Sequence, residues 1–212
     1  MLSTRLCRRM NTTLRSTGRS LSTASAEVPA GGGQYSEAVK IMHWAMGLSA
    51  LGCFAFVNAA QQTEDKKAKM NYMFIHKSFG TLAAALLIPR LGIRAMSSHP
   101  GHLTSVAWEK FAATASHTAM YGFLIAMPLS GVAMGYYGGK GLPFFFTTLP
   151  GASKENKNGK LAGQAFKLHK QLGFPMEMLF LAHLGGVGYH VASGHSIFGR
   201  IVPGMAAAAA KP

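Results

Sequence analysis

Four long apolar stretches restrict the fold of this chain more than any other feature. They cover residues 41–60, about 72–94, about 111–137 and about 171–194, and the helix of the last stretch is expected to begin near Ala165. A helix needs about 20 mostly apolar residues to cross the hydrocarbon core of a bilayer. Within lipid, only helices and closed barrels satisfy the hydrogen bonds of every backbone group. The sequence therefore predicts an all-α fold, in the form of a four-helix transmembrane bundle.

The distribution of charge agrees with a membrane protein. Only 13% of the 212 residues are charged and 49% are apolar, whereas about a quarter of the residues of a soluble domain are charged. A soluble bundle with unusually apolar helices is the alternative, and four such long runs disfavour it. The net charge is +14, but the basic residues flank the apolar runs, as they do in the loops of membrane proteins. A nucleic-acid-binding protein gathers such residues on one soluble face, so no nucleic acid is expected as a partner.

The N-terminal segment has the composition of an organellar targeting sequence. It holds five arginines and no acidic residue before Glu27, with many serines and threonines and no apolar core. This composition is typical of a transit peptide and differs from a secretory signal; a disordered basic tail is the alternative. We therefore expect residues 1–34 to be a mitochondrial transit peptide and linker, 35–203 to be the domain that lies in the inner membrane, and 204–212 to be a tail.

Histidine side chains recur inside the apolar runs. Six of the nine histidines lie within these runs or at their edges. A polar ring costs free energy in lipid, so it usually faces the interior of the protein and has a partner there. For any single histidine an interhelical hydrogen bond is a sufficient explanation, but it does not account for the whole set. The six are His43, His76, His117, His169, His183 and His190.

Helix geometry sorts four of these histidines into two pairs. His169 and His183 are 14 residues apart, which turns a helix through about 1400°, close to four full turns, and advances it by about 21 Å. Because successive spans cross the membrane in opposite directions, His43 lies level with His183, and His76 lies level with His169. Two axial imidazoles saturate haem iron and suit it to electron transfer, so the sequence predicts two bis-histidine sites for haem b. Zinc is the weaker alternative, because it needs four ligands that converge on one point.

Two arginines stand at the end of the second apolar run. Arg90 and Arg94 are one helical turn apart, and on this topology they lie on the same side of the membrane as His43. They are either interface anchors whose charged ends reach out of the hydrocarbon, or partners of the haem propionates, because a guanidinium group matches the geometry of a carboxylate.

Several short motifs occur in order between Tyr35 and Pro203. They are Ile41-Met42-His43-Trp44, Ile75-His76-Lys77-Ser78-Phe79-Gly80, Arg90-Leu91-Gly92-Ile93-Arg94, Pro128-Leu129-Ser130-Gly131 and Arg200-Ile201-Val202-Pro203. Each motif alone is weak evidence. In this order and spacing the segment resembles the bacterial-type cytochrome b561 family, which also includes the cytochrome b subunits of some hydrogenases.

The resemblance implies roles for the histidines and for partners. The axial ligands would be His43, His76, His169 and His183, and the candidate quinone-site residues would be His117 and His190. Electrons would be exchanged with a quinone pool. Some members of the family oxidise superoxide and reduce ubiquinone, and others relay electrons from a partner dehydrogenase. Three positions depart from the family pattern: Val191 replaces a second histidine, His195 stands where an aspartate is usual, and Pro175 lies between the ligands of the last span.

Three functions stay open at this point. The first is a dihaem cytochrome that exchanges electrons with quinone and scavenges superoxide, and the second is a haem-bearing subunit of a larger respiratory complex. The third is a structural accessory subunit, which the retention of all four ligand histidines disfavours. Membrane orientation is open too. The family topology would place ten of the basic residues after the leader outside and six inside, against the positive-inside rule.

Overall fold

The chain folds into four long helices with a short hairpin and a short C-terminal helix. A computed structural model describes residues 34–98, 100–102 and 104–205, so the expected leader, apart from Gln34, and most of the expected tail lie outside the described residues. The all-α class is confirmed. The elements are α1 (Glu37–Gln62), α2 (Lys66–Met96), α3 (Ala107–Tyr137), β1 (Leu142–Phe144), β2 (Thr147–Leu149), α4 (Gly159–Ala192) and α5 (Phe198–Ile201).

Polar side chains fix where three of the long helices begin. The first backbone N–H groups of a helix have no partner within the helix, and a Ser, Asp or Asn side chain just before it supplies one. Ser36 accepts from the Val39 N–H, Asp65 accepts from the N–H groups of Lys67 and Ala68, and Asn158 accepts from the Leu161 N–H. These caps explain why the observed helices extend beyond the apolar runs from which they were predicted.

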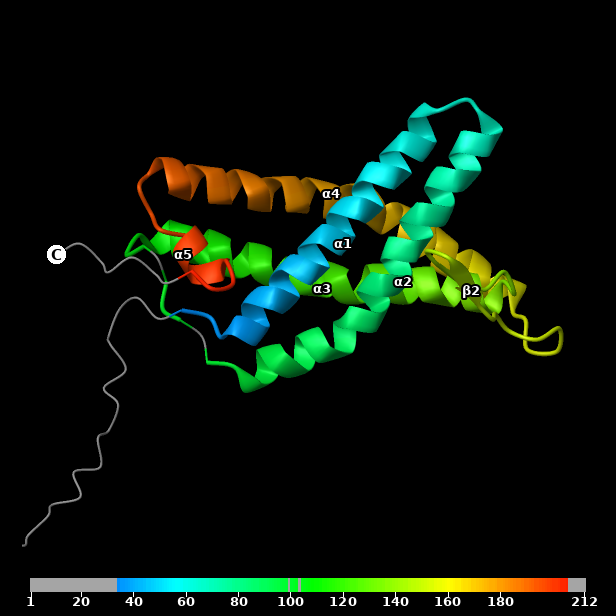
Figure 1. Ribbon diagram of the computed structural model, residues 1–212, viewed down its shortest axis with the longest axis horizontal. Coiled ribbons are helices and arrows are strands. Elements are labelled where there is room, and N and C mark those ends of the chain that lie inside the picture. Colours follow the sequence, from blue (N-terminus) through cyan, green and yellow to red (C-terminus); the bar gives the residue numbers. More distant parts are fainter. Residues whose placement is uncertain (1–33, 99, 103, 206–212) are drawn as a thin grey trace, which may run out of the picture.

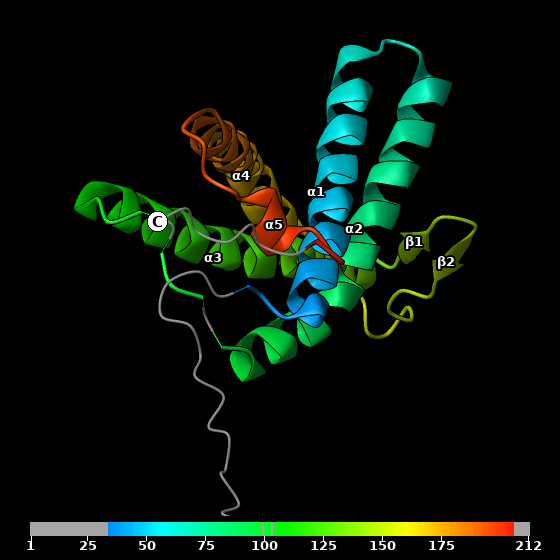
Figure 2. The same ribbon diagram turned by 60° about the vertical axis from the view of Figure 1, so that its left-hand side comes forward.

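The four long helices form two helical hairpins that cross each other. Helices α1 and α2 lie side by side, as do α3 and α4, and the first hairpin runs steeply across the second (Figure 1). A view turned by 60° shows the same crossing, with the β-hairpin beside α2 (Figure 2). The expectation of one regular four-helix bundle is therefore not confirmed.

Three of the described helices are long and apolar enough to cross a membrane: α1, α2 and α3. This makes the chain a multi-pass membrane protein. The fourth predicted span coincides with helix α4, whose first third carries Lys160, Lys167 and Lys170. These lysines make the first part of α4 less apolar. The structure shows α4 as a helix, and its crossing of the membrane stays a prediction.

A small β-hairpin lies in the connection between α3 and α4. Strands β1 and β2 pair antiparallel, with Leu142 opposite Leu149. At the turn, Phe145 takes a left-handed backbone conformation with a φ angle of 49°. Its N–H donates to the Ser78 hydroxyl at 2.9 Å and its ring lies 5.2 Å from the Phe79 ring. The hairpin is thereby docked on α2, two residues beyond His76.

The C-terminal segment returns to the first turn of α1. The Lys40 side chain is fully buried, and its ammonium group donates to Glu37 at 2.8 Å, to Gln34 at 3.0 Å and to the Met205 carbonyl at 3.3 Å. The other Glu37 oxygen accepts from the Gly204 N–H at 3.1 Å. A buried ammonium needs such partners to offset its lost hydration. The cluster therefore holds α5 against the start of α1.

One glycine sets the closeness of α1 and α2. A Cβ atom added at Gly52 would lie 2.7 Å from the Phe79 ring. We expect Gly52→Ala to lower the free energy of unfolding by about 1–3 kcal/mol through overpacking, although Ala alone favours a helix by about 0.5–1 kcal/mol. Gly122→Ala in α3 is the matched control, because a Cβ there meets no atom within 4 Å. Thermal unfolding in detergent measures both, and equal stability of the two variants would contradict the close approach.

Candidate functional site

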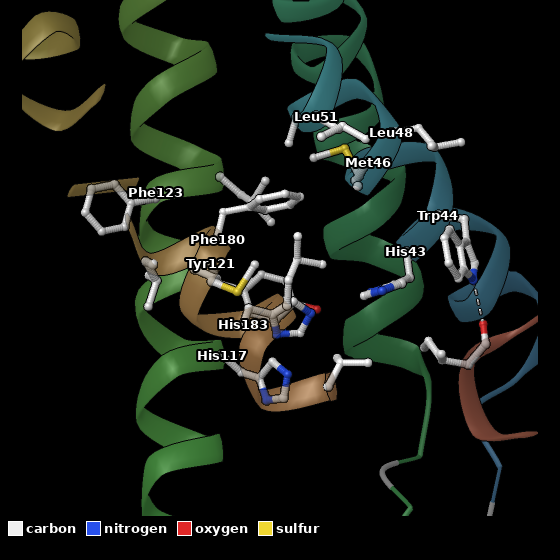
Figure 3. Close-up of a pocket in the computed structure, with 18 of the residues that line it drawn as sticks. His43, Trp44, Met46, Leu48, Leu51, His117, Tyr121, Phe123, Phe180 and His183 are labelled. Atoms are coloured by element: carbon white, nitrogen blue, oxygen red, sulfur yellow. Dashed lines mark hydrogen bonds between the residues drawn. The ribbon is translucent and has the colours of Figure 1, made fainter. Parts of the chain in front are cut away.

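The first predicted histidine pair is assembled between the two hairpins. His43 of α1 and His183 of α4 have ring centroids 6.2 Å apart, with ring planes tilted by 58°. Both rings line a cavity of about 330 Å³, a size in the usual range for a small-molecule site. Figure 3 shows the two rings facing this space amid apolar side chains, among them Met46, Leu51 and Phe180.

A third histidine joins the same cavity. The His117 ring of α3 lies 5.5 Å from the His183 ring, on the opposite side from α1 (Figure 3). The resemblance implies for His117 only a place at a quinone site, and nothing in the sequence indicates that its ring contacts a predicted ligand. Arg90 of α2 lines the cavity as well. The cavity therefore combines apolar walls with a few convergent polar groups.

The C-terminal turn closes one side of the cavity. Ile197, Phe198 and Ile201 contribute to its lining, and the Trp44 indole N–H donates to the Ile201 carbonyl at 3.0 Å (Figure 3). The burial of Lys40 and this indole bond hold the same segment in place. Ile201, which belongs to the Arg200-Ile201-Val202-Pro203 motif, therefore forms part of the cavity wall.

The second predicted pair is also assembled, and its rings are oriented by hydrogen bonds. His76 of α2 and His169 of α4 have ring centroids 6.3 Å apart. The Nδ1 atom of His76 lies 2.8 Å from the Cys53 carbonyl, and that of His169 lies 3.1 Å from the Met127 carbonyl. A carbonyl oxygen only accepts hydrogen bonds, so both Nδ1 atoms carry the proton. Each ring therefore offers its Nε2 lone pair to a metal.

The Pro128-Leu129-Ser130-Gly131 motif now has a structural explanation. The Ser130 hydroxyl donates to the Met127 carbonyl at 2.9 Å and lies 3.0 Å from Nδ1 of His169. A Cβ atom at Gly131 would lie 3.4 Å from the His169 ring, so a larger residue would crowd that ring. The motif thus positions a histidine on a different helix.

The arginines at the end of α2 carry nitrogen atoms without partners. Arg90 donates through Nη1 to the Val39 carbonyl at 3.0 Å and lies over the Tyr121 ring. Its Nε atom, and Nη1 of Arg94, are buried without a hydrogen-bond partner within the described part of the chain. A buried guanidinium normally satisfies its donors. These free donors therefore mark a place suited to an anionic group.

His190 lies away from both pairs. Its ring contacts those of Tyr189 and His195, at 5.3 and 5.2 Å. The Nδ1 atoms of His190 and His195 are buried and have no hydrogen-bond partner among the described residues. The structure thus does not bring together His117 and His190, the two residues that the resemblance connected with quinone.

Comparison with known families matches this arrangement. The sequence model of the prokaryotic cytochrome b561 family matches residues 34–204, which is most of the chain and nearly all of its described part. The chain belongs to the prokaryotic cytochrome b561 family. No curated protein matches it. The family carries haem b in membranes and transfers electrons with it, which agrees with the three membrane-competent helices of this cytochrome.

The histidine pairs of this cytochrome b561 fit a bis-histidine haem. An imidazole nitrogen binds a first-row metal ion at about 2 Å, so two rings on opposite sides of one metal would have centres about 6 Å apart. The two observed separations are 6.2 and 6.3 Å. Within the described residues, no cluster of three or more His, Cys, Asp or Glu side chains could hold a metal ion directly.

The hydrogen bond that Ser130 accepts from Nδ1 of His169 provides a test of the second pair. A group that hydrogen-bonds the other ring nitrogen of a metal-binding histidine typically contributes about 10–100-fold to metal affinity. We expect Ser130→Ala to weaken haem retention at this pair by about tenfold, the lower end, because the Met127 carbonyl still holds Nδ1. Ser49→Ala is the control, since the Ser49 hydroxyl bonds only within α1, to the Ala45 carbonyl. Haem loss to a competing apoprotein measures both, and equal rates would contradict the assigned role of Ser130.

Proposed function

We propose that this protein is a dihaem cytochrome with one haem b at each histidine pair. His43 and His183 would be the axial ligands of one haem, and His76 and His169 those of the other. The observation that carries the proposal is the approach of both pairs to the separation that a single iron requires. Iron with two imidazole ligands has no open position, so it supplies one-electron transfer rather than oxygen binding.

The position of the ligands along α4 supports two separate haems. His169 and His183 are 14 residues apart, which corresponds to about 21 Å along a helix. No single haem iron has both as ligands at that distance. Each pair also uses a different helix of the first hairpin, α1 or α2. The protein would thus hold a relay of two electron carriers at two depths.

The arginines and the C-terminal turn would complete the first site. The buried donors of Arg90 and Arg94 suit haem propionates, because a guanidinium group pairs with a carboxylate through charge-assisted hydrogen bonds. The apolar cavity lining excludes water from the region around His43 and His183. The Trp44 bond to the Ile201 carbonyl keeps the turn closed over it.

Quinone is the proposed electron partner, and superoxide the proposed alternative donor. His117 touches the His183 ring, so a quinone head group beside His117 would lie within a short distance of the first haem. His190, with its free Nδ1 atom, is the second candidate contact. Near the other pair, Lys77 and Lys170 adjoin His76 and His169 in sequence. Such positive charges attract an anion such as superoxide by electrostatic steering.

The proposed setting is the mitochondrial inner membrane. The composition of residues 1–34 supports it, with the membrane domain over 35–203 and the tail over 204–212. We also propose that α4 crosses the membrane as a fourth span. Its lysines lie near one end, and His169 and His183 contact rings of other helices instead of standing alone in lipid. Membership of a larger respiratory complex, with a dehydrogenase as donor, is the alternative role for the same haem domain.

Haem stoichiometry tests the assignment of the ligands. We expect two haems per chain in the purified protein and one in His183→Ala or His169→Ala, because each substitution removes a ligand of only one pair. His190→Ala is the matched control on the same helix and should retain both. Pyridine-haemochrome absorbance with protein quantitation gives the ratio. The pairing would have to be abandoned if His117→Ala lost a haem while His169→Ala kept both.

Reduction by a quinol tests the function itself. Addition of a short-chain ubiquinol under nitrogen should convert the oxidised spectrum to that of reduced low-spin haem b. We expect His117→Ala to keep both haems and to slow this reduction at least tenfold if the substitution removes a contact in the transfer step. A protein with full haem content that neither ubiquinol nor superoxide reduces would rule out quinone exchange and favour a partner subunit as donor.

A further inference from the structure

A half-buried carboxyl group lies among apolar side chains and plays no part in the proposed haem sites. Glu177 is in the middle of α4, and its Oε1 atom accepts a hydrogen bond from the Asn58 side chain of α1 at 2.6 Å. An ionisable residue at such a position is costly and usually has a function. It lies eight residues after His169 and six before His183, between the two proposed haems along the helix.

The surroundings of Glu177 offer no charge of opposite sign. It lines a second pocket, of about 230 Å³, and the other lining residues include no lysine, arginine or histidine. Asn58 is the only polar neighbour in that lining, and a neutral amide compensates a half-buried carboxylate only in part. The other lining residues are Leu51, Phe54, Ala55, Phe180, Leu181 and Leu184.

This second pocket shares a wall with the cavity of the first histidine pair. Leu51, Phe180 and Leu184 line both. On the far side of that wall the charged and titratable groups are His43, Arg90, His117, Tyr121 and His183. The wall is apolar, so a charge on one side is weakly screened from a charge on the other.

We propose that Glu177 is a proton-binding site that takes up one proton when one electron reaches the haem at His43 and His183. The proposal rests on the proposed haem at that pair. The electron adds one negative charge next to an apolar wall that already has a carboxylate behind it. One proton from water then binds to the free Oε2 atom, and the carboxylate becomes a neutral carboxylic acid. Charge is balanced, and no covalent bond other than the O–H bond is formed.

The partner and the location of Glu177 suit this role. The Asn58 amide donates to Oε1, and that oxygen accepts equally well as a carboxylate oxygen or as the carbonyl of the acid. The partner therefore need not move when the proton binds. Asn58 is one helical turn before the end of α1 at Gln62.

The pH dependence of the haem midpoint potential tests the proposal. In the full-length protein, with dithionite and ferricyanide as titrants, the potential of one haem should fall as pH rises, because reduction then carries a proton with it. Glu177→Gln mimics the protonated acid. Its potential should not vary with pH and should equal the low-pH value of the wild type. At neutral pH and fixed potential the reduced-to-oxidised ratio should rise roughly tenfold, the effect of one unit charge at about 10 Å. Glu155→Gln, in the exposed loop before α4, is the matched control and should keep the wild-type profile.

Two further readouts separate a proton site from a merely structural residue. Reduced-minus-oxidised infrared spectra of the wild type should show the C=O band of a newly protonated carboxyl group, which Glu177→Gln loses. Asn58→Leu keeps the carboxyl group but removes its hydrogen-bond donor, so the band should persist at a shifted frequency. A pH-independent potential in a wild-type protein with two haems would overturn the proton site and leave the proposed function intact. Absence of haem at the His43–His183 pair would refute the proposed function instead.

Discussion

The structure depends on the cost of placing imidazole rings in a medium without water. A ring in lipid needs a partner on another helix, and here each of four rings meets one across the two hairpins. His43 and His76 belong to the first hairpin, whereas His169 and His183 both belong to α4 of the second. The crossing of the hairpins is thus the arrangement that lets one helix serve two pairs. A haem at each pair would join the hairpins, so cofactor binding and folding are linked.

The parts of the fold that followed from sequence are those fixed by rigid local geometry. Apolar length identified the helices, and the rise and turn of a helix placed His169 and His183 on one face at two depths. Alternation of span direction then selected the two pairs whose rings the structure brings near each other. The same reasoning did not predict the crossing of the hairpins, because helix-crossing angles depend on which side chains interlock. It also missed the β-hairpin, since residues 142–149 carry no alternating apolar pattern that could be told from a loop.

The hydrogen bonds and ring contacts within the site could not be predicted from the sequence, for a different reason. The Nδ1 partners of His76 and His169 are backbone carbonyls of Cys53 and Met127, and every residue has a carbonyl, so side-chain identity reveals nothing about them. The approach of His117 to His183 depends likewise on how α3 and α4 pack. Only Ser130 and Gly131 could be noticed in the sequence, as part of a motif. The structure explains that motif, because both residues lie against the ring of His169.

The two pairs differ in a way that gives the proposed relay a direction. Both rings of the second pair donate from Nδ1 to a carbonyl, which raises the basicity of the metal-binding nitrogen and stabilises the oxidised iron. Within the described residues, neither His43 nor His183 has such a bond, and the cationic Arg90 lines their cavity, which stabilises the reduced iron. The second haem would then have the lower potential of the two. Electrons that enter near the lysines beside His76 and His169 would move towards His43 and His183, where His117 and the proton site at Glu177 adjoin the same cavity. Because a lipid-soluble quinone takes up protons with its electrons, a proton-binding group belongs at that end of the relay.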